Sequence, residues 1–173
     1  NNLKIVYKVG LIVALLALVM VGSVSFAAVR MRSMADASAD MVTRIDRASA
    51  QAARAARYAE AYVSAAFQLL ADTSDFAKER ILAHARDSRK HYDSRMTAVL
   101  KDMPEKQALI KPVFEKFQQS FVECESVVDA AAAAKTKEDV ETATGRLKAE
   151  CVPWMEDAIA AHAAMVDKLL AEA

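Results

Sequence analysis

Residues 137–173, KEDVETATGRLKAECVPWMEDAIAAHAAMVDKLLAEA, carry the pattern that decides the fold class. Mostly apolar residues recur here at alternating steps of four and three, which is the spacing of a helix face packed in a bundle. The positions on this face are Val140, Thr144, Leu147, Cys151, Trp154, Ala158, Ala161, Met165 and Leu169. The stretch therefore predicts one long amphipathic helix over 137–173, interrupted at Pro153.

The same periodicity predicts earlier helices over 30–71, 75–102 and 104–134, with Thr136 as the N-cap of the last helix. Alanine makes up about a fifth of the chain, with three Gly and three Pro, a composition that favours helix. Because connections of a few residues join neighbouring helices, we predict an all-α, antiparallel up-down-up-down four-helix bundle. The first helix places on its apolar face Met34, Met41, Ile45, Ala48, Ala52, Ala55, Ala59, Tyr62, Ala66 and Leu69.

Before the bundle, residues 9–29 (VGLIVALLALVMVGSVSFAAV) contain no charge. At about 1.5 Å per residue this stretch is long enough to cross a bilayer as a helix. We therefore expect a cytoplasmic N-terminus over 1–8, an inner-membrane span over 9–29, and residues 30–173 in the periplasm or outside the cell. A secretory signal peptide cleaved after Ser25-Phe26-Ala27 is the competing interpretation, and it also exports the bundle.

Several function classes lack support in the sequence. The formal net charge is zero, which does not favour nucleic acid as a partner. The chain has neither a glycine-rich phosphate loop nor a recognisable nucleophile and base, so we expect a non-enzyme. No Glu-x-x-His or Cys-x-x-Cys-His pattern occurs, so we expect no metal and no cofactor. An exported bundle holding non-covalent haem, for instance through His91 and Met96, stays open as an alternative.

The order of parts resembles the four-helix-bundle sensor class of bacterial methyl-accepting chemotaxis proteins: a short basic N-terminus, one span, a helical bundle and a long last helix. The opening stretch LKIVYKVGLIVALLALVMVGSVSFAAVRMRSM is similar to the way such receptors begin. The resemblance covers the whole chain but rests on architecture, because this class has no short diagnostic motif.

The resemblance implies a chemoreceptor sensing domain, acting as a homodimer, that detects a small molecule or a loaded periplasmic binding protein. Its last helix would pass a displacement through a second span, expected soon after Ala173, to a HAMP domain and a signalling coiled coil that regulates a histidine kinase. We expect the chain to be a fragment that lacks those parts. A sensor domain of a histidine kinase or cyclase, and a purely structural membrane-anchored coiled coil, are further alternatives.

Two cysteines occupy predicted apolar faces. Cys124 lies about 12 residues before the connection at Thr136 and Cys151 about 15 after it, so an antiparallel helix pair would bring them to nearly the same level. An oxidising periplasm would permit a disulfide between them. The alternative is two small buried side chains without a bond.

Two groups of residues are candidates for ligand binding. Phe117 and Phe121 should meet Trp154 across the last two helices, and Pro153 would kink the helix beside them, which opens a pocket or is accommodated by ordinary core packing.

Arg54 and Arg57 belong to an arginine stripe on the first helix, together with Arg44 and Arg47. In the aspartate-type members of the receptor class that the chain resembles, arginines on this helix hold ligand carboxylates from both subunits, and the guanidinium fork suits that task. No motif assigns those positions to particular arginines of this chain. A solvated face with salt bridges is the alternative interpretation of the stripe.

Overall fold

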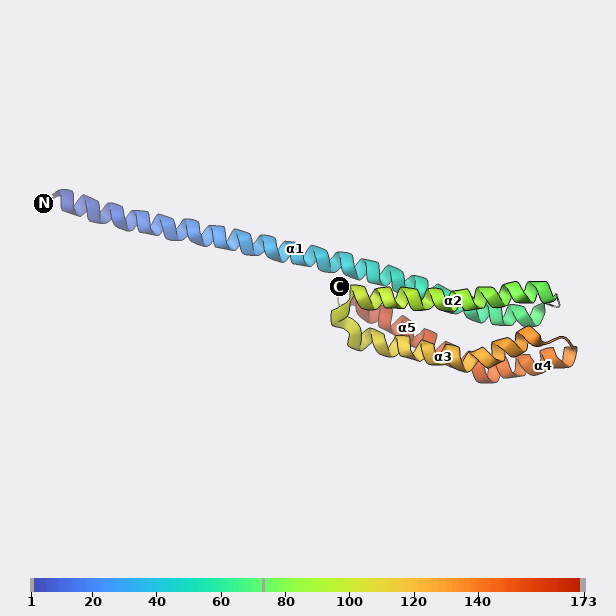
Figure 1. Ribbon diagram of the computed structural model, residues 1–173. Coiled ribbons are helices and arrows are strands. Elements are labelled where there is room, and N and C mark those ends of the chain that lie inside the picture. The colour runs from blue at the N-terminus through green and yellow to red at the C-terminus, as the bar shows by residue number, and fades with distance from the viewer. Residues whose placement is uncertain (1, 73, 172–173) are drawn as a thin grey trace. The chain divides into compact units, whose positions relative to one another are not determined.

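The computed structural model describes residues 2–72 and 74–171, apart from the side chains of residues 2–9, 11–15, 17 and 37. The described part is 96% helical and contains no strand, which confirms the all-α prediction. Its elements in chain order (Figure 1) are α1 (Asn2–Ala71), α2 (Asp75–Asp102), the 3₁₀ turn η1 (Pro104–Lys106), α3 (Gln107–Ala133), α4 (Lys137–Arg146), the π-helical turn η2 (Leu147–Cys151) and α5 (Val152–Ala171).

The chain divides into two units, residues 1–43 and residues 44–173. In the first unit, Met34 and Met41, which the sequence places on the apolar face of the first helix, are 71% and 37% exposed. The physical reason is that this unit contains part of α1 alone, without a second element to cover an apolar face. The buried face of α1 begins at Ile45, in the second unit.

The second unit has one hydrophobic cluster, to which residues of α1, α2, α3, α4, η2 and α5 contribute. α2 packs against α3, and α3 packs against α5. The rings of Tyr62 on α1 and Phe121 on α3 lie 4.9 Å apart, and those of Tyr92 on α2 and Phe117 on α3 lie 4.4 Å apart. On α1 the buried positions are mostly alanines, and such small residues leave room for the large rings of the facing helices.

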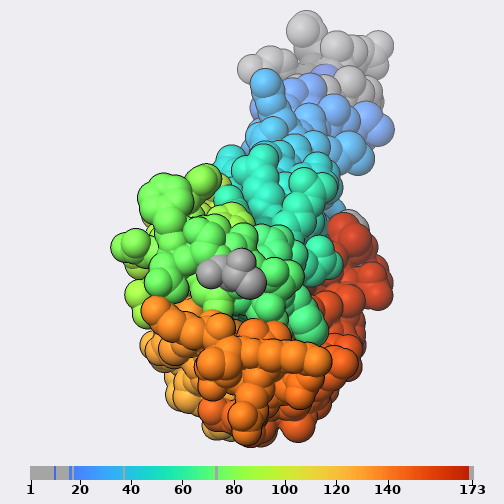
Figure 2. All heavy atoms as spheres, turned by 90° about the vertical axis from the view of Figure 1, so that its right-hand side faces the viewer, coloured from blue at the N-terminus to red at the C-terminus, as the bar shows by residue number. Residues whose placement is uncertain are grey.

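The α1–α2 and α3–α4 connections lie at the same end of the second unit, the end that faces the viewer in Figure 2. Lys78 of α2 is buried there, and its Nζ donates hydrogen bonds to the carbonyl oxygens of Ala131, at 3.5 Å, and Ala134. These carbonyls lie at the C-terminal end of α3, and the C-terminal end of a helix carries partial negative charge. Lys135 also forms an ion pair of 3.1 Å with Asp75, so the two connections are linked to each other.

Thr136 caps α4, as its place in the sequence predicted. Its Oγ1 accepts a hydrogen bond from the backbone N–H of Asp139 at 3.1 Å, and the Asp139 carboxylate accepts one from the backbone N–H of Thr136 at 2.9 Å. This reciprocal pair is a capping box. The backbone N–H groups of Thr136 and Lys135 that donate to the Asp139 carboxylate lower its pKa.

A π-helical turn changes the buried face of the last helical segment. The backbone N–H of Val152 donates to the carbonyl of Leu147, five residues earlier, directly before Pro153. A proline has no N–H and its ring crowds the carbonyl four residues before it, which favours a wider turn. The buried face therefore passes from Cys151 to Met155, while Trp154 is 39% exposed.

Candidate functional site

A surface groove of about 410 Å³ lies along α1 and α2 in the second unit. Its lining residues are Arg54, Arg57, Tyr58, Ala61, His84 and Arg95. Arg54 and Arg57 are the two arginines named from the sequence as ligand-binding candidates. Arg95 and His84 come from α2, and sequence reasoning did not connect them with this site.

Two contacts between α1 and α2 fix the walls of this arginine groove. The Arg95 guanidinium donates a hydrogen bond of 2.9 Å to the side-chain oxygen of Gln51. Four residues before Arg95 on α2, the ring of His91 stacks on that of Tyr58 of α1, with centroids 4.9 Å apart and planes at 24°. The Arg95 head group and the aromatic wall are thus held in place before any ligand arrives.

The charge of the groove is uncompensated. Three of its six lining side chains are guanidinium groups and none is acidic. Among the described residues, Arg54 and Arg57 have no ion-pair or hydrogen-bond partner. Elsewhere in the unit the pattern differs, because Arg86 pairs with Asp129 and Arg146 pairs with Glu150.

Guanidinium groups on two facing walls are suited to one chemical task. Each presents parallel N–H donors that match the two oxygens of a carboxylate or phosphate. Arg54 and Arg57 lie three residues apart on an exposed part of α1, where like charges repel each other weakly. Both side chains are exposed, as the solvated face considered from the sequence also predicts.

The structure does not assemble the pocket predicted from Phe117, Phe121, Trp154 and Pro153. Phe117 and Phe121 are fully buried in the core, whereas Trp154 and Pro153 are exposed. The predicted contact between these phenylalanines and Trp154 is therefore wrong. The π-helical turn explains the error, because it takes up an extra residue and turns Trp154 away from the core face.

Instead, Phe117 and Tyr92 lie against a buried histidine that the sequence did not single out. The ring of His162 lies 5.9 Å from that of Phe117 and 6.1 Å from that of Tyr92, and its Nε2 is 3.0 Å from the carbonyl oxygen of Ala52 on α1. Because a carbonyl only accepts, Nε2 carries the hydrogen in this contact. Burial lowers the pKa of His162. It also raises the pKa of Tyr92, and that of Tyr62 to about 12.

A disulfide joins Cys124 of α3 to Cys151 of η2, with Cα atoms 4.7 Å apart. Both cysteines are almost completely buried. The similar distances of the two residues from the α3–α4 connection, about 12 and about 15 residues, were the signal for this pairing. The bond ties the π-helical turn to the neighbouring helix at the level of the aromatic core.

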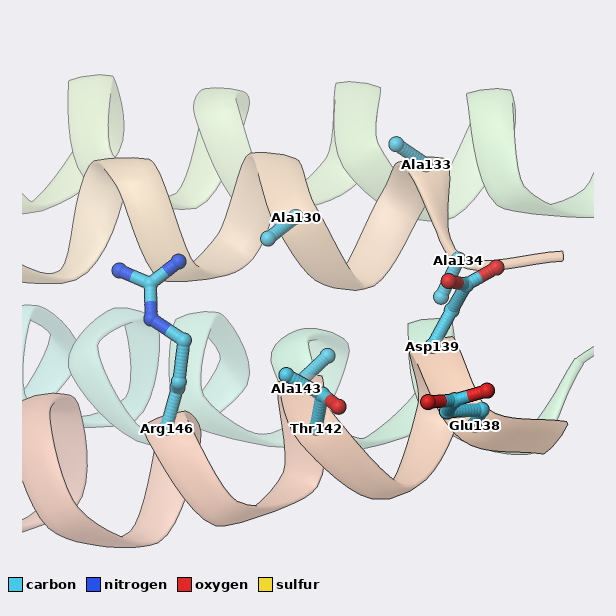
Figure 3. A pocket seen from close by; sticks show the side chains of 8 residues that line it. All are labelled: Ala130, Ala133, Ala134, Glu138, Asp139, Thr142, Ala143 and Arg146. Atoms are coloured by element: carbon cyan, nitrogen blue, oxygen red, sulfur yellow. The ribbon is translucent and has the colours of Figure 1, made fainter. Parts of the chain in front are cut away.

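Another groove, of about 400 Å³, lies between α3 and α4 near the connection of these helices. Figure 3 shows Arg146 reaching from α4 toward α3 at one end, and Glu138 and Asp139 at the other. Arg146 already donates to Glu150 at 2.8 Å, and Asp139 serves in the capping box. Since Arg146 and Asp139 are already engaged, the arginine groove is the better candidate for a ligand.

Within residues 2–72 and 74–171, His, Cys, Asp and Glu side chains form no group of three or more that could hold a metal ion. The chain matches no protein-family model, and its comparison with curated proteins and with solved structures gave no match. The functional interpretation therefore rests on the residues and contacts described above.

Proposed function

We propose that this chain is the membrane-anchored sensing part of a bacterial chemoreceptor. In this proposal residues 9–29 cross the inner membrane, and the second unit is an antiparallel up-down-up-down four-helix bundle in the periplasm. The bundle binds a small molecule or a loaded binding protein, and a homodimer passes the signal to a cytoplasmic histidine kinase through further segments of the receptor.

The exposed apolar stretch of α1 is the observation that carries the proposal. Within the described residues, one helix is long and apolar enough to cross a membrane, and its most apolar stretch is not buried against any other part of the chain. Its large apolar side chains, each 62–72% exposed, are Leu18, Val19, Met20, Val21, Val24, Phe26, Val29, Met31 and Met34. Soluble proteins rarely leave so large a continuous apolar surface in water, and lipid is a solvent that would cover it on every side.

Contacts within the second unit support the bundle topology. Gln51 contacts Arg95 and Tyr58 stacks on His91, so residues later in α1 meet residues earlier in α2, as in an antiparallel pair. The disulfide suits the oxidising side of the membrane.

A helix that is stiff along its axis can carry a signal if a ligand favours one of its positions over another. A difference of about 1–3 kcal/mol in binding free energy between the two positions would shift their populations enough. The segment α4–η2–α5 is the proposed moving element, and the hydrogen bond from His162 to the Ala52 carbonyl is one contact between this segment and α1.

Membrane insertion is tested first, by fractionating bacteria that express the full chain. We expect the protein to stay in the membrane after alkaline carbonate washing and to be released by detergent. Val21→Asp with Val24→Asp should weaken insertion, since Asp at a helix centre costs roughly 2.5–3.5 kcal/mol on insertion scales. Ala50→Asp, at an exposed position of α1 in the second unit, is the matched control and should stay inserted. A soluble product whose mass shows cleavage after Ala27 would reject the anchor.

Signalling is tested separately, by joining the full chain to the cytoplasmic portion of a chemoreceptor of known output. Ligands found to bind the chain should then change the output of the hybrid receptor. A hybrid that is inserted and binds ligand without any change in output would reject the sensing function.

A further inference from the structure

We propose that His162 is a proton-binding site that controls the contact between α5 and α1: when its Nδ1 takes up a proton from solution, α5 moves away from α1. The use of this movement as a signal rests on the proposed sensing function. The movement itself does not, because His162 and the residues in contact with it all lie in the second unit.

Four helices meet at the His162 ring. From α5, its Nε2 donates a hydrogen bond of 3.0 Å to the Ala52 carbonyl of α1. The ring also lies 6.1 Å from that of Tyr92 on α2 and 5.9 Å from that of Phe117 on α3. The residue is 2% exposed. A change of charge at this one side chain therefore acts on the contacts of α5 with three other helices.

The surroundings of His162 suit the neutral ring and oppose the charged one. The neutral ring has its hydrogen on Nε2, and protonation of Nδ1 would create a second N–H donor together with a positive charge. Among the described residues, both Nδ1 and the Tyr92 hydroxyl lack a hydrogen-bond partner, so no acceptor faces Nδ1. A charged, unpaired donor is strongly disfavoured inside an apolar core. Burial accordingly lowers the pKa of His162.

Other titratable groups near this site cannot produce the same response. Burial raises the pKa of Tyr92 above its ordinary value, so its hydroxyl stays neutral in acid. Burial also raises the pKa of Asp93, and acid therefore favours the folded form at that residue, which is the opposite sign. The titratable and charged side chains nearest in sequence to the four contacting residues, each at least partly exposed, are Arg54, His91, Asp93, Lys116, Asp157 and Asp167.

The attachment of α5 determines which part of it can move. Just before α5, Cys151 is bonded to Cys124 of α3, and His162 lies about 16 Å further along the helix. At the level of Ala52 the buried side chains of α1 are alanines, which cover little apolar area. Loss of the His162 contact therefore lets the C-terminal part of α5 leave α1, while its beginning stays attached to α3.

The size of the response follows from the two protonation states. In the closed form His162 stays neutral, whereas in the open form it binds a proton with the ordinary histidine pKa of about 6.5. The closed form therefore keeps its full stability above this pH and loses it as the pH falls. The ratio of open to closed protein rises up to about thirtyfold between pH 7.5 and pH 5.

The test measures the distance between α1 and α5 in the full chain, held in lipid nanodiscs with its disulfide intact. Nitroxide labels at Ala53→Cys and Ala163→Cys, two exposed positions, report the distance by pulsed electron paramagnetic resonance. From pH 7.5 to pH 5 we expect a second, longer distance to appear and the ratio of open to closed protein to rise at least about tenfold. Identical distance distributions at both pH values would overturn the proposal.

Substitutions assign the response to His162. His162→Gln keeps an N–H donor for the Ala52 carbonyl but does not titrate, so this variant should stay closed at pH 5. His162→Phe fills the same space with an apolar ring and provides the same comparison if the glutamine variant does not fold. His91→Gln removes the exposed histidine beside Tyr92 and should keep the full response. Opening at pH 5 in a folded His162 variant, or loss of the response in His91→Gln, would reject the assignment.

The two proposals fail in different ways. A hybrid receptor that responds to its ligand, but whose α1–α5 distance does not depend on pH, would reject the proton site and leave the sensing function in place. A pH-dependent distance in a hybrid receptor whose output no stimulus changes would support the proton site and reject the sensing function.

Discussion

The disulfide between Cys124 and Cys151 allows a stability prediction whose size follows from the structure. The two cysteines are 27 residues apart in the chain, and replacing both by alanine removes the bond. Alanine avoids burying a new hydroxyl group, because both positions are at most 1% exposed. The helices keep their other core contacts, so we expect the double variant to fold with a lower free energy of unfolding.

The magnitude comes from the freedom that the bond removes from the unfolded chain. For a closed loop of this length, the chain-entropy relation gives about 3.5 kcal/mol at 25 °C. In a helical unit of this size a loss of that order lowers the melting temperature by roughly 10 °C. The loss of two buried sulfur atoms adds a small cavity cost in the same direction.

Thermal unfolding followed by far-ultraviolet circular dichroism measures this difference. Reductant should destabilise the native protein and leave the double alanine variant unchanged, which serves as the internal control. A melting temperature of the double variant within about 3 °C of the native value would refute the reasoning, because the bond would then contribute little to folding. Intact mass before and after reduction and alkylation checks independently that the two thiols are oxidised.

Three further predictions concern polar groups of the second unit. Burial lowers the pKa of His162, so as the pH falls the unfolded chain binds a proton at a higher pH than the folded protein does. The free energy of unfolding should therefore fall as the pH drops below about 6.5. In His162→Phe, denaturant titrations between pH 7 and pH 5 should show a smaller fall. Lys78→Met should destabilise the protein by about 1–3 kcal/mol in chemical denaturation, because the Ala131 and Ala134 carbonyls lose their donor; no change would mean that water replaces the ammonium group. Thr136→Ala should cost about 1 kcal/mol in the same assay and Thr136→Ser much less, since serine restores the cap.

The helices and most of their buried faces could be predicted because these properties are local. The predicted helix over 75–102 has the bounds of α2, and α1 ends at Ala71 as expected. Alternation of apolar and polar residues at helical spacing reflects which side of each helix is covered, whichever partner covers it. The positions of Cys124 and Cys151 along the axes of their two helices could be estimated in the same way, from the number of residues on either side of one short connection.

The buried face around Trp154 could not be predicted, because the heptad pattern assumes a constant number of residues per turn. The π-helical turn Leu147–Cys151 has more residues than an ordinary helical turn, and the spacing of apolar residues does not reveal one extra residue in a turn. Pro153 did indicate that the helix is irregular at this point. It did not indicate whether the helix would kink or widen, and only the widened turn moves Met155 into the core.

Only the α1 side of the arginine groove could be predicted from the sequence, for a related reason. Arg54 and Arg57 form a visible pair on one helix, but the contribution of Arg95 depends on how α1 and α2 are aligned with each other. That alignment is set by contacts between the helices, such as the stacking of Tyr58 on His91. The burial of His162 depends on the same kind of information, since its partner is a backbone carbonyl 110 residues away.

The sequence by itself determined that this protein is helical, where its helices lie in the chain, and that residues 9–29 are uncharged and mostly apolar. These properties follow from composition and from spacings of three and four residues, which act within a single helix. Only the tertiary structure decided how side chains are placed relative to other helices. Three arginines line one groove, a histidine lies inside an aromatic core, and Trp154 lies at the surface. Such meetings depend on the rotation and axial level of each helix against its neighbours, and packing over the whole core sets both at once.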